Sequence, residues 1–265
     1  KEEVCMMMTL RKYSTIWILL CILILIFLSG YGLDYSALNN FSPSMVVDTV
    51  KGLLKPDWSY FFDGSGEDVF SLMILTIAIA FVGTVIGTIF AFPLMLLASH
   101  NLWSKNTIVP KIAKIILDIL RSFPELIYAI IFVKMVGPGP FAGVLAIGVH
   151  QIGMLGKLFT EEMEKMNEDA IEAMHSVGAN SIQTFFYARL PQVMPAYTSL
   201  ILNHFEIGVR SAATLGLVGA GGIGAPLIFA IQARNWDKVS IILLVVVVTV
   251  FVLDIANGWL RKKLK

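Results

Sequence analysis

The sequence predicts an all-helical membrane protein with about six transmembrane helices, and three observations predict it. Hydrophobic residues make up 57% of the 265 residues and charged residues only 15%, whereas a typical soluble domain carries about 25% charged residues. The apolar residues gather in long runs, and a helix needs about 20 mostly apolar residues to cross a bilayer. The polar stretches between these runs are too short to form a separate soluble domain, so we expect one membrane domain over residues 1–265.

Six runs are apolar enough and long enough to be predicted spans. The second run is longer than a span needs, so we expect it to tilt or to extend beyond the lipid. The fourth run is the weakest, because it contains His150, Gln151 and Lys157. The first run is too long for the apolar part of a cleaved signal, and further spans follow it. The predicted spans are residues 14–33, 69–99, 112–136, 141–159, 194–218 and 239–256.

Small residues and prolines inside the spans predict local geometry. Gly83 and Gly87 form a G-x-x-x-G pattern in the second run, which is typical of closely packed membrane helices. Pro93 and Pro124 are expected to kink their helices. The two cysteines, Cys5 and Cys21, have neither the number nor the spacing of a disulfide framework or a metal site.

The basic residues predict the orientation, because Lys and Arg collect in the short cytoplasmic loops of membrane proteins. They gather at both ends of the chain and between the second and third runs, whereas the stretch between the first and second runs is acidic, so both termini are expected in the cytoplasm. The balance of 20 basic and 19 acidic residues does not indicate a nucleic-acid partner. The basic residues that predict the orientation are Lys1, Arg11, Lys12, Lys105, Lys111, Arg261, Lys262, Lys263 and Lys265. The acidic stretch has only Lys51 and Lys55 among Asp34, Asp48, Asp57, Asp63, Glu67 and Asp68.

A glycine-rich stretch at residues 216–224 raises the question of nucleotide binding. Gly219, Gly221 and Gly224 have the spacing G-x-G-x-x-G, but that fingerprint requires a preceding strand within a βαβ unit. Here the glycines follow an apolar helix, so we interpret them as a closely packed turn in which glycine adopts dihedrals that other residues avoid. No cofactor, metal cluster or catalytic set is expected in this chain.

The polar segment at residues 160–191 predicts two short helices. Gly178 suits the position just after a helix, where a left-handed residue ends it. Asn180 and Gln183 have the spacing of a capping box for a second helix, and Pro191 is expected to end that helix. The apolar stripe of the first helix steps by three or four residues, and it consists of Met163, Met166, Ala170, Met174 and Val177.

Two interpretations of this segment are open from the residues alone. It could be an amphipathic hairpin that rests on the protein's own surface. It could equally be a docking element whose methionine-lined face adapts to a partner.

The sequence EAMHSVGANSIQTFFYARLP, residues 172–191, resembles the EAA loop of binding-protein-dependent ABC importers, E-A-A-x3-G-x9-I-x-L-P. Five positions and the nine-residue gap match, while Met174 replaces the second Ala and Ala188 replaces Ile. Residues 121–158 and 216–227, with Asp254 and Arg261, resemble the permeases of phosphonate importers, and the resemblance extends over about residues 69–265. The matching positions are Glu172, Ala173, Gly178, Leu190 and Pro191.

This resemblance implies a type I ABC importer (MetI-like) permease fold in the inner membrane. It implies a non-enzymatic subunit that moves phosphonate, or the related oxyanions phosphite and phosphate, and three kinds of protein partner: a second permease copy, two cytoplasmic ATPases and an extracellular phosphonate-binding protein. Residues 172–178 would then form the coupling helix in a groove of the ATPase. The residues implied in coupling are Glu172, Ala173, Met174, Gly178, Ala179, Leu190 and Pro191.

Charged residues inside spans are costly in lipid and usually face a cavity or each other. Arg121 and Glu125 have i, i+4 spacing in the third run, as do Glu206 and Arg210 in the fifth. Each pair is either a structural ion pair or part of a lining for an anionic substrate. The remaining polar candidates for this lining are His150 and His204, each of which could instead bond a neighbouring carbonyl.

Two other classes of function compete with the importer. A secondary transporter of a small anion, driven by an ion gradient, would use Glu125 and Glu206 as its intramembrane acids and would need no ATPase. A membrane assembly factor would need neither the Arg–Glu pairs nor the EAA spacing.

Overall fold

A computed structural model of the chain describes residues 2–31, 42–64, 66–103 and 107–264. The chain divides into two compact units, residues 1–48 and 49–265. The first contains α1 (Glu2–Tyr31), whose apolar part from Ile16 onward is almost entirely exposed. The helix α3 (Pro43–Leu53) crosses the boundary between the units. Lys1, residues 32–33 of the first predicted span, Asp34, Lys105 and Lys265 lie outside the described residues, as do the side chains of Cys5, Arg11 and Lys12.

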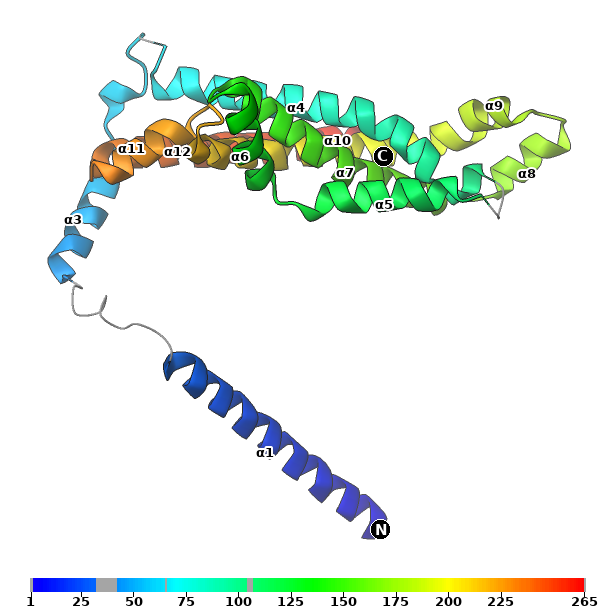
Figure 1. Ribbon diagram of the computed structural model, residues 1–265, viewed down its shortest axis with the longest axis horizontal. Helices are drawn as coiled ribbons and strands as arrows, with labels where there is room; N and C mark the ends of the chain where they lie inside the picture. Colours follow the sequence, from blue (N-terminus) through cyan, green and yellow to red (C-terminus); the bar gives the residue numbers. More distant parts are fainter. Residues whose placement is uncertain (1, 32–41, 65, 104–106, 265) are drawn as a thin grey trace. The chain divides into compact units, whose positions relative to one another are not determined.

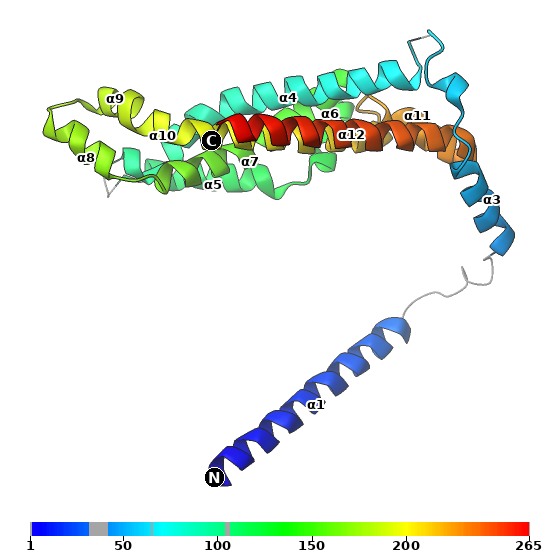
Figure 2. The same cartoon turned by 180° about the vertical axis from the view of Figure 1, so that it is seen from behind.

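The second unit is a bundle of long helices joined by short ones (Figures 1 and 2). The long helices α4, α7, α10 and α12 run side by side, and α5 lies along α7. The hairpin of α8 and α9 projects at one end of this bundle, and α11 lies toward the other. The bounds are α4 (Val69–Ala98), α5 (Val109–Ser122), α6 (Glu125–Val136), α7 (Pro140–Glu164), α8 (Asp169–Ser176), α9 (Ser181–Thr184), α10 (Leu190–Leu215), α11 (Gly224–Gln232) and α12 (Trp236–Leu264).

Helix α7 is the centre of the bundle, since it packs against α4, α5, α6 and α10. A Cβ atom placed on Gly83 would lie 2.8 Å from Cγ2 of Ile147, and one on Gly87 would lie 2.7 Å from Cβ of Gln151. Both glycines therefore allow the α4 backbone to lie directly against α7. The prediction of close packing from the G-x-x-x-G pattern is confirmed.

Among the described residues, three helices are long and apolar enough to cross a membrane: α4, α7 and α12. The set includes α7, which corresponds to the weakest predicted span. Its polar residue Gln151 is buried inside the bundle rather than exposed at the surface. The number of helices that cross the bilayer stays a prediction.

The prediction of one helix over residues 112–136 is wrong. Helix α5 ends at Ser122, Phe123 is extended at φ −88° and ψ 130°, and α6 begins only after Pro124. The reason is local, because the ring of a proline disfavours helical dihedrals in the residue before it. Pro93 shows the other outcome, since it lies within α4 without ending that helix.

The single amphipathic stripe predicted from Met163 to Val177 is also wrong. Met163 belongs to α7, where it is fully buried, and the chain breaks before α8 begins at Asp169. The Asn167 side chain accepts a hydrogen bond from the Asp169 N–H at 3.0 Å. Asparagine side chains compete with helical backbone bonds in this way, so the helix restarts instead of continuing.

The turn and the second cap in this segment are as predicted. Gly178 is left-handed at φ +80°, and the bonds Gly178 N–H to His175 O and Ala179 N–H to Met174 O form a Schellman motif. Asn180 and Gln183 form a reciprocal capping box. Pro191, however, does not end the second helix. It lies in the first turn of α10, where its missing N–H is tolerated, after a π-helical turn at Phe185–Arg189.

The glycine-rich stretch is a tight turn that follows a helix. Gly219, Gly221 and Gly222 are left-handed, and a Cβ on Gly221 would lie 2.8 Å from Pro140. The N–H of Ile223 donates to the Thr76 hydroxyl at 2.9 Å. The turn is therefore packed against the starts of α4 and α7, which confirms its interpretation as a packed turn.

We expect Gly87→Ala to destabilise the bundle, because its Cβ would press on Gln151 and on the Gly148 carbonyl at 3.2 Å. Overpacking of this kind costs about 1–3 kcal/mol. Gly258→Ala in α12 is the matched control, since no atom lies within 4 Å of its added Cβ and alanine favours a helix by about 1 kcal/mol. Thermal unfolding in detergent measures both, and equal melting temperatures would contradict the packing.

Candidate functional site

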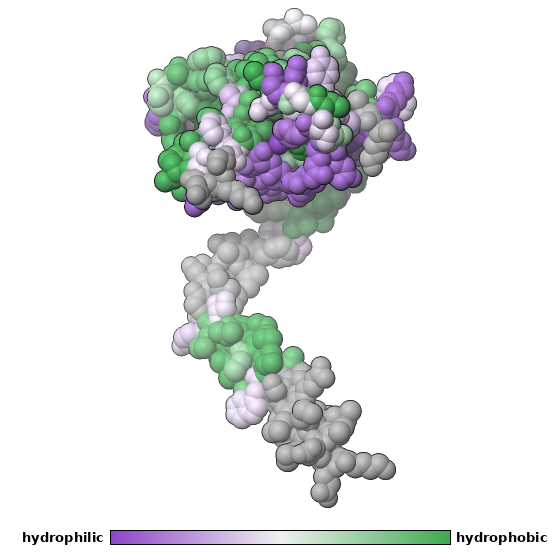
Figure 3. All heavy atoms as spheres, turned by 90° about the vertical axis from the view of Figure 1, so that its right-hand side faces the viewer, coloured by the Kyte–Doolittle hydropathy of each residue, from purple (hydrophilic) through white to green (hydrophobic). Residues whose placement is uncertain are grey.

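The hairpin of α8 and α9 exposes apolar side chains at its tip. Val177 and Ile182 beside the turn are 79% and 70% exposed, and Tyr187 in the π-helical turn after α9 is 76% exposed, while Ile171 and Ala188 are buried on the inner side. Hydrophilic residues cover most of this end of the bundle, with apolar ones between them (Figure 3). Apolar residues grouped on a polar end of a protein are typical of a surface that contacts another protein.

The residues predicted for coupling lie on this hairpin and at the start of α10. Glu172 and Ala173 are exposed on α8, and Met174 is half-buried. Gly178 and Ala179 form the turn, and no atom lies within 4 Å of a Cβ added to Gly178. Leu190 packs against the core beside Phe159 and Tyr197, and Pro191 is exposed.

A cleft of about 550 Å³ lies between α8 and the linker from α4 to α5. Arg189 lines it from the π-helical turn, and its Nη1 atom is buried without a hydrogen-bond partner among the described residues. Burial lowers the pKa of Arg189, and the nearby charge of Glu168 acts in the opposite direction. Sequence reasoning missed Arg189, which occupies an unspecified position of the EAA pattern. The remaining lining residues are His100, Asn101, Trp103, Glu168, Ile171 and Glu172.

Glu206 on α10 is the centre of a polar cluster with α12. Its side chain is only 5% exposed and accepts a hydrogen bond from Arg210, whose side chain is 54% exposed. From α12, Arg261 Nη2 lies 3.6 Å and Asn257 Nδ2 3.4 Å from Glu206 Oε2. Glu206 and Arg210 thus form the contact that their i, i+4 spacing predicted, and its role as a structural ion pair or as part of a substrate lining stays a prediction. The contacts from α12 were not predicted, because 51 or more residues separate the partners in the sequence.

The predicted pair of Arg121 and Glu125 does not form, because the break at Pro124 puts them on different helices. Arg121 Nε donates to Asp118 Oδ1 at 2.9 Å, within α5. Glu125 instead lies 3.8 Å from Nε2 of His150 on α7. The other ring nitrogen of His150 is 3.2 Å from the Phe123 carbonyl. This contact agrees with the alternative that the histidine bonds a neighbouring carbonyl.

The six candidate path residues do not form one group. Arg121, Glu125 and His150 lie near the break between α5 and α6, whereas Glu206, paired with Arg210 on α10, contacts α12. His204 is buried, and its backbone carbonyl accepts a hydrogen bond from Gln151 Nε2 at 3.0 Å. In the part of the chain that the structure describes, no three His, Cys, Asp or Glu side chains are placed to hold a metal ion.

Comparison with known proteins identifies the class. Residues 83–265 match the family model described as binding-protein-dependent transport system inner membrane component. The fold resembles that of the MetNI methionine ABC transporter in an inward-facing conformation, with a TM-score of 0.63 at 19% identity over 85% of this chain and 100% of that one. The fold is thus that of an ABC importer permease.

Two relatives in sequence are closer. The phosphite transport system permease protein PtxC of Stutzerimonas stutzeri is 36% identical over 88% of this chain and 82% of its own length. The phosphate-import permease protein PhnE of Mycolicibacterium smegmatis is 37% identical over 77% of this chain and 38% of its own length. The chain belongs to the binding-protein-dependent transport system inner membrane component family. It is an integral membrane permease subunit, not an enzyme, and it works with ATPase and binding-protein subunits.

We expect Glu206→Gln to destabilise the protein more than Arg210→Gln. The first change removes the carboxylate that Arg210, Arg261 and Asn257 all contact, whereas the second leaves two of these contacts in place, and a hydrogen bond to a charged group contributes about 1.5–3 kcal/mol. The Arg210 side chain is half-exposed, and such a charge contributes about 1 kcal/mol or less. Thermal unfolding of both variants in detergent checks the order, and the reverse order would show that Glu206 is not the centre of the cluster.

Proposed function

We propose that the chain is the transmembrane subunit of an ATP-driven importer for a small phosphorus oxyanion: phosphonate, phosphite or phosphate. The family match supports the importer, and the relatives named for phosphite and phosphate transport support the substrate class. The observation that carries the proposal is the exposed α8–α9 hairpin with the EAA spacing. The ion-gradient transporter has no such support, since it would need no docking surface for an ATPase.

In this proposal, residues 169–189 are the contact to the ATPase, with both chain termini in the cytoplasm. Val177 and Ile182 project beside the Gly178 turn and supply apolar area for a groove in the partner. A second permease copy completes the pathway as a homodimer, two ATPases bind the two hairpins, and an extracellular binding protein delivers the anion. Closure of the ATPases then displaces the hairpins as rigid bodies.

Positive charge for the anion comes from arginines that are not fully neutralised. Arg210 and Arg261 share the single carboxylate of Glu206, so this cluster carries a net positive charge. Arginine matches the geometry of phosphate-like oxyanions through paired N–H donors. Because Arg210 is half-exposed, it is the member of the cluster that reaches an anion. Arg121, which pairs with Asp118 near the helix break, is the second candidate at a separate place, and Glu125, His150 and His204 remain candidates for the lining.

The proposal predicts ATP-dependent uptake in liposomes that contain the permease, its ATPase and its binding protein. Uptake should require a phosphorus oxyanion that the binding protein binds, and Arg210→Gln should lower it while the complex still assembles. Phosphite, phosphate and a phosphonate are compared as substrates, with methionine as the negative control. Uptake that proceeds without ATP, or that follows an imposed ion gradient, would contradict the proposal.

We expect Gly178→Val to weaken binding of the ATPase. A left-handed residue with a β-branched side chain costs roughly 1–2 kcal/mol in backbone strain, and the added methyl groups lie on the proposed contact. Gly64→Val is the matched control, because Gly64 is also left-handed, at φ +75°, with open space around it, but lies outside the hairpin. Co-purification of the ATPase checks the prediction, and equal retention by both variants would contradict the coupling role of the hairpin.

A further inference from the structure

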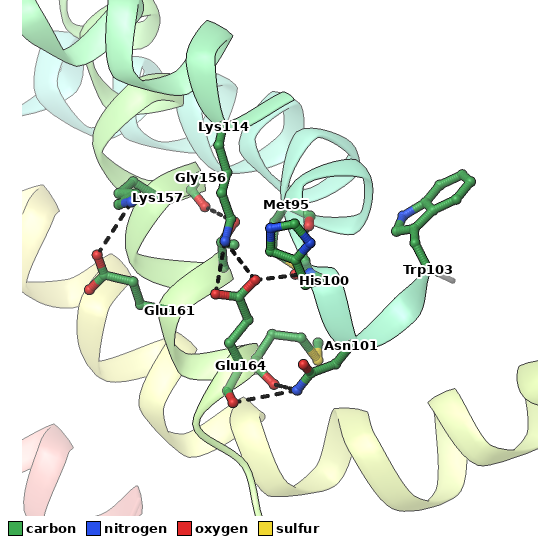
Figure 4. Close-up of polar contacts among 12 residues, drawn as sticks. Met95, His100, Asn101, Trp103, Lys114, Gly156, Lys157, Glu161 and Glu164 are labelled. Carbon is green, nitrogen blue, oxygen red and sulfur yellow. Dashed lines mark hydrogen bonds and ion pairs between the residues drawn. The ribbon is translucent and has the colours of Figure 1, made fainter. Parts of the chain in front are cut away.

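A single carboxylate ties the end of α7 to the neighbouring elements (Figure 4). Oε1 of Glu164 accepts hydrogen bonds from Lys114 Nζ on α5 at 2.8 Å and from the backbone N–H of His100 at 2.9 Å. Oε2 lies 3.0 Å from the same Lys114 Nζ. The Asn101 amide reaches the carbonyls of Met163 and Glu164, each at 3.4 Å. The last turn of α7 is therefore bound both to α5 and to the linker between α4 and α5.

These contacts differ from an ordinary surface ion pair. The Lys114 and Glu164 side chains are only 24% and 26% exposed, and charge-assisted hydrogen bonds of this length are the strong ones. One turn earlier on α7, Glu161 and Lys157 are 3.8 Å apart with Glu161 more exposed (Figure 4). Exposed pairs of that kind contribute little, so Glu161 provides an internal comparison for Glu164.

Glu164 also occupies a special place along the chain. It is the last residue of α7, the break follows at residues 165–168, and the hairpin begins with α8. A displacement of the hairpin reaches the bundle through this break on one side and through the continuous run of α9, the π-helical turn and α10 on the other. On the bundle side of residues 165–168, the contacts of Glu164 connect the chain to α5 as well as to α7.

Helix α5 packs closely against α7 over the part that leads to the helix break at Phe123. A Cβ on Gly156 would lie 2.5 Å from a methyl group of Leu117, and one on Gly153 would lie 2.6 Å from the backbone nitrogen of Arg121. These contacts hold α5 against α7 from Leu117 to Arg121, and the Glu164 carboxylate holds the Lys114 end of α5. The far end of α5 carries Asp118 and Arg121, next to the break at Phe123.

We propose that Glu164 is the positioning residue that transfers movement of the α8–α9 hairpin to α5 and so to the helix break near Arg121. This role rests on the proposed function of the hairpin as the ATPase contact. Without the carboxylate, the hairpin still binds the ATPase and still moves α10, but the movement that enters through residues 165–168 no longer reaches α5. ATP is then hydrolysed without the matching import.

The test compares Glu164→Ala, Glu164→Gln and the matched control Glu161→Ala in liposomes with the complete complex of permease, ATPase and binding protein. Inorganic phosphate, phosphite and a phosphonate serve as probes, and uptake and ATP hydrolysis are measured on the same sample. Glu164→Ala should keep ATPase binding and hydrolysis but lower uptake per ATP by about tenfold, within the usual range of coupling between sites. Glu164→Gln keeps an acceptor for the His100 N–H and should recover part of this ratio, while Glu161→Ala should match the wild type.

A second variant covers the case in which Glu164→Ala does not fold. Lys114→Met removes the contact to α5 but leaves the bond from His100, so it should lower uptake per ATP in the same way. In the double variant Lys114→Met with Glu164→Gln, the loss of uptake per ATP should be smaller than the two single losses combined, because the effects of contacting residues are not additive.

Two results would overturn the proposal alone: an unchanged uptake per ATP in Glu164→Ala and Lys114→Met, or an equal loss of hydrolysis and uptake, which a purely structural role predicts. A wild-type complex that shows no ATP-dependent uptake of any probe would overturn the proposed function, and this role with it. The wild-type measurement thus separates the two failures.

Discussion

The close contact between α4 and α7 is the constraint on which the rest of the structure depends. Gly83 and Gly87 leave room for the side chains of Ile147 and Gln151, so the α4 backbone lies directly against α7. This contact places the Gln151 amide 3.1 Å from the Thr84 hydroxyl and within reach of α10 through the His204 carbonyl. Buried polar groups need such partners, so one amide fixes the positions of three helices on which the candidate site is built.

The features that were predictable from the sequence are those with local causes. The left-handed turn at Gly178, the capping box of Asn180 and the close packing at Gly83 each depend on residue types within a few positions. The break after Phe123 also had a local signal, since Pro124 follows it, but the apolar run concealed it. The contacts of Glu206 with Arg261 and of Glu164 with Lys114 join residues 50 or more positions apart, and no local rule selects one acidic residue over another.

The hairpin and the bundle are stabilised in different ways. The bundle uses glycine contacts and fully buried apolar residues such as Phe159 and Leu155. The hairpin of α8 and α9 is held at its inner side by few residues, among them Ile171 and Ala188, and exposes Val177 and Tyr187. Elements with few buried contacts are the ones that open or move at low free-energy cost. A hairpin with so few buried contacts is suited to a role in which a partner displaces it while the bundle moves as a unit.

The polar face of α5 extends from the end of α7 at Glu164 to the helix break at Phe123. Lys114, Asp118 and Arg121 follow one another at i, i+4 and i+7, so they share one face of the helix, while Ala113 and Leu117 are buried on the side next to it. One end of this face meets Glu164 at the exit from α7, and the other meets the break at Phe123. Helix α5 is only 14 residues long and is packed against α7 at Gly153 and Gly156, so little bending is available to it. In the proposed role of Glu164, a change at the Lys114 end of α5 is therefore transmitted along the helix to Arg121, the second candidate for the proposed path.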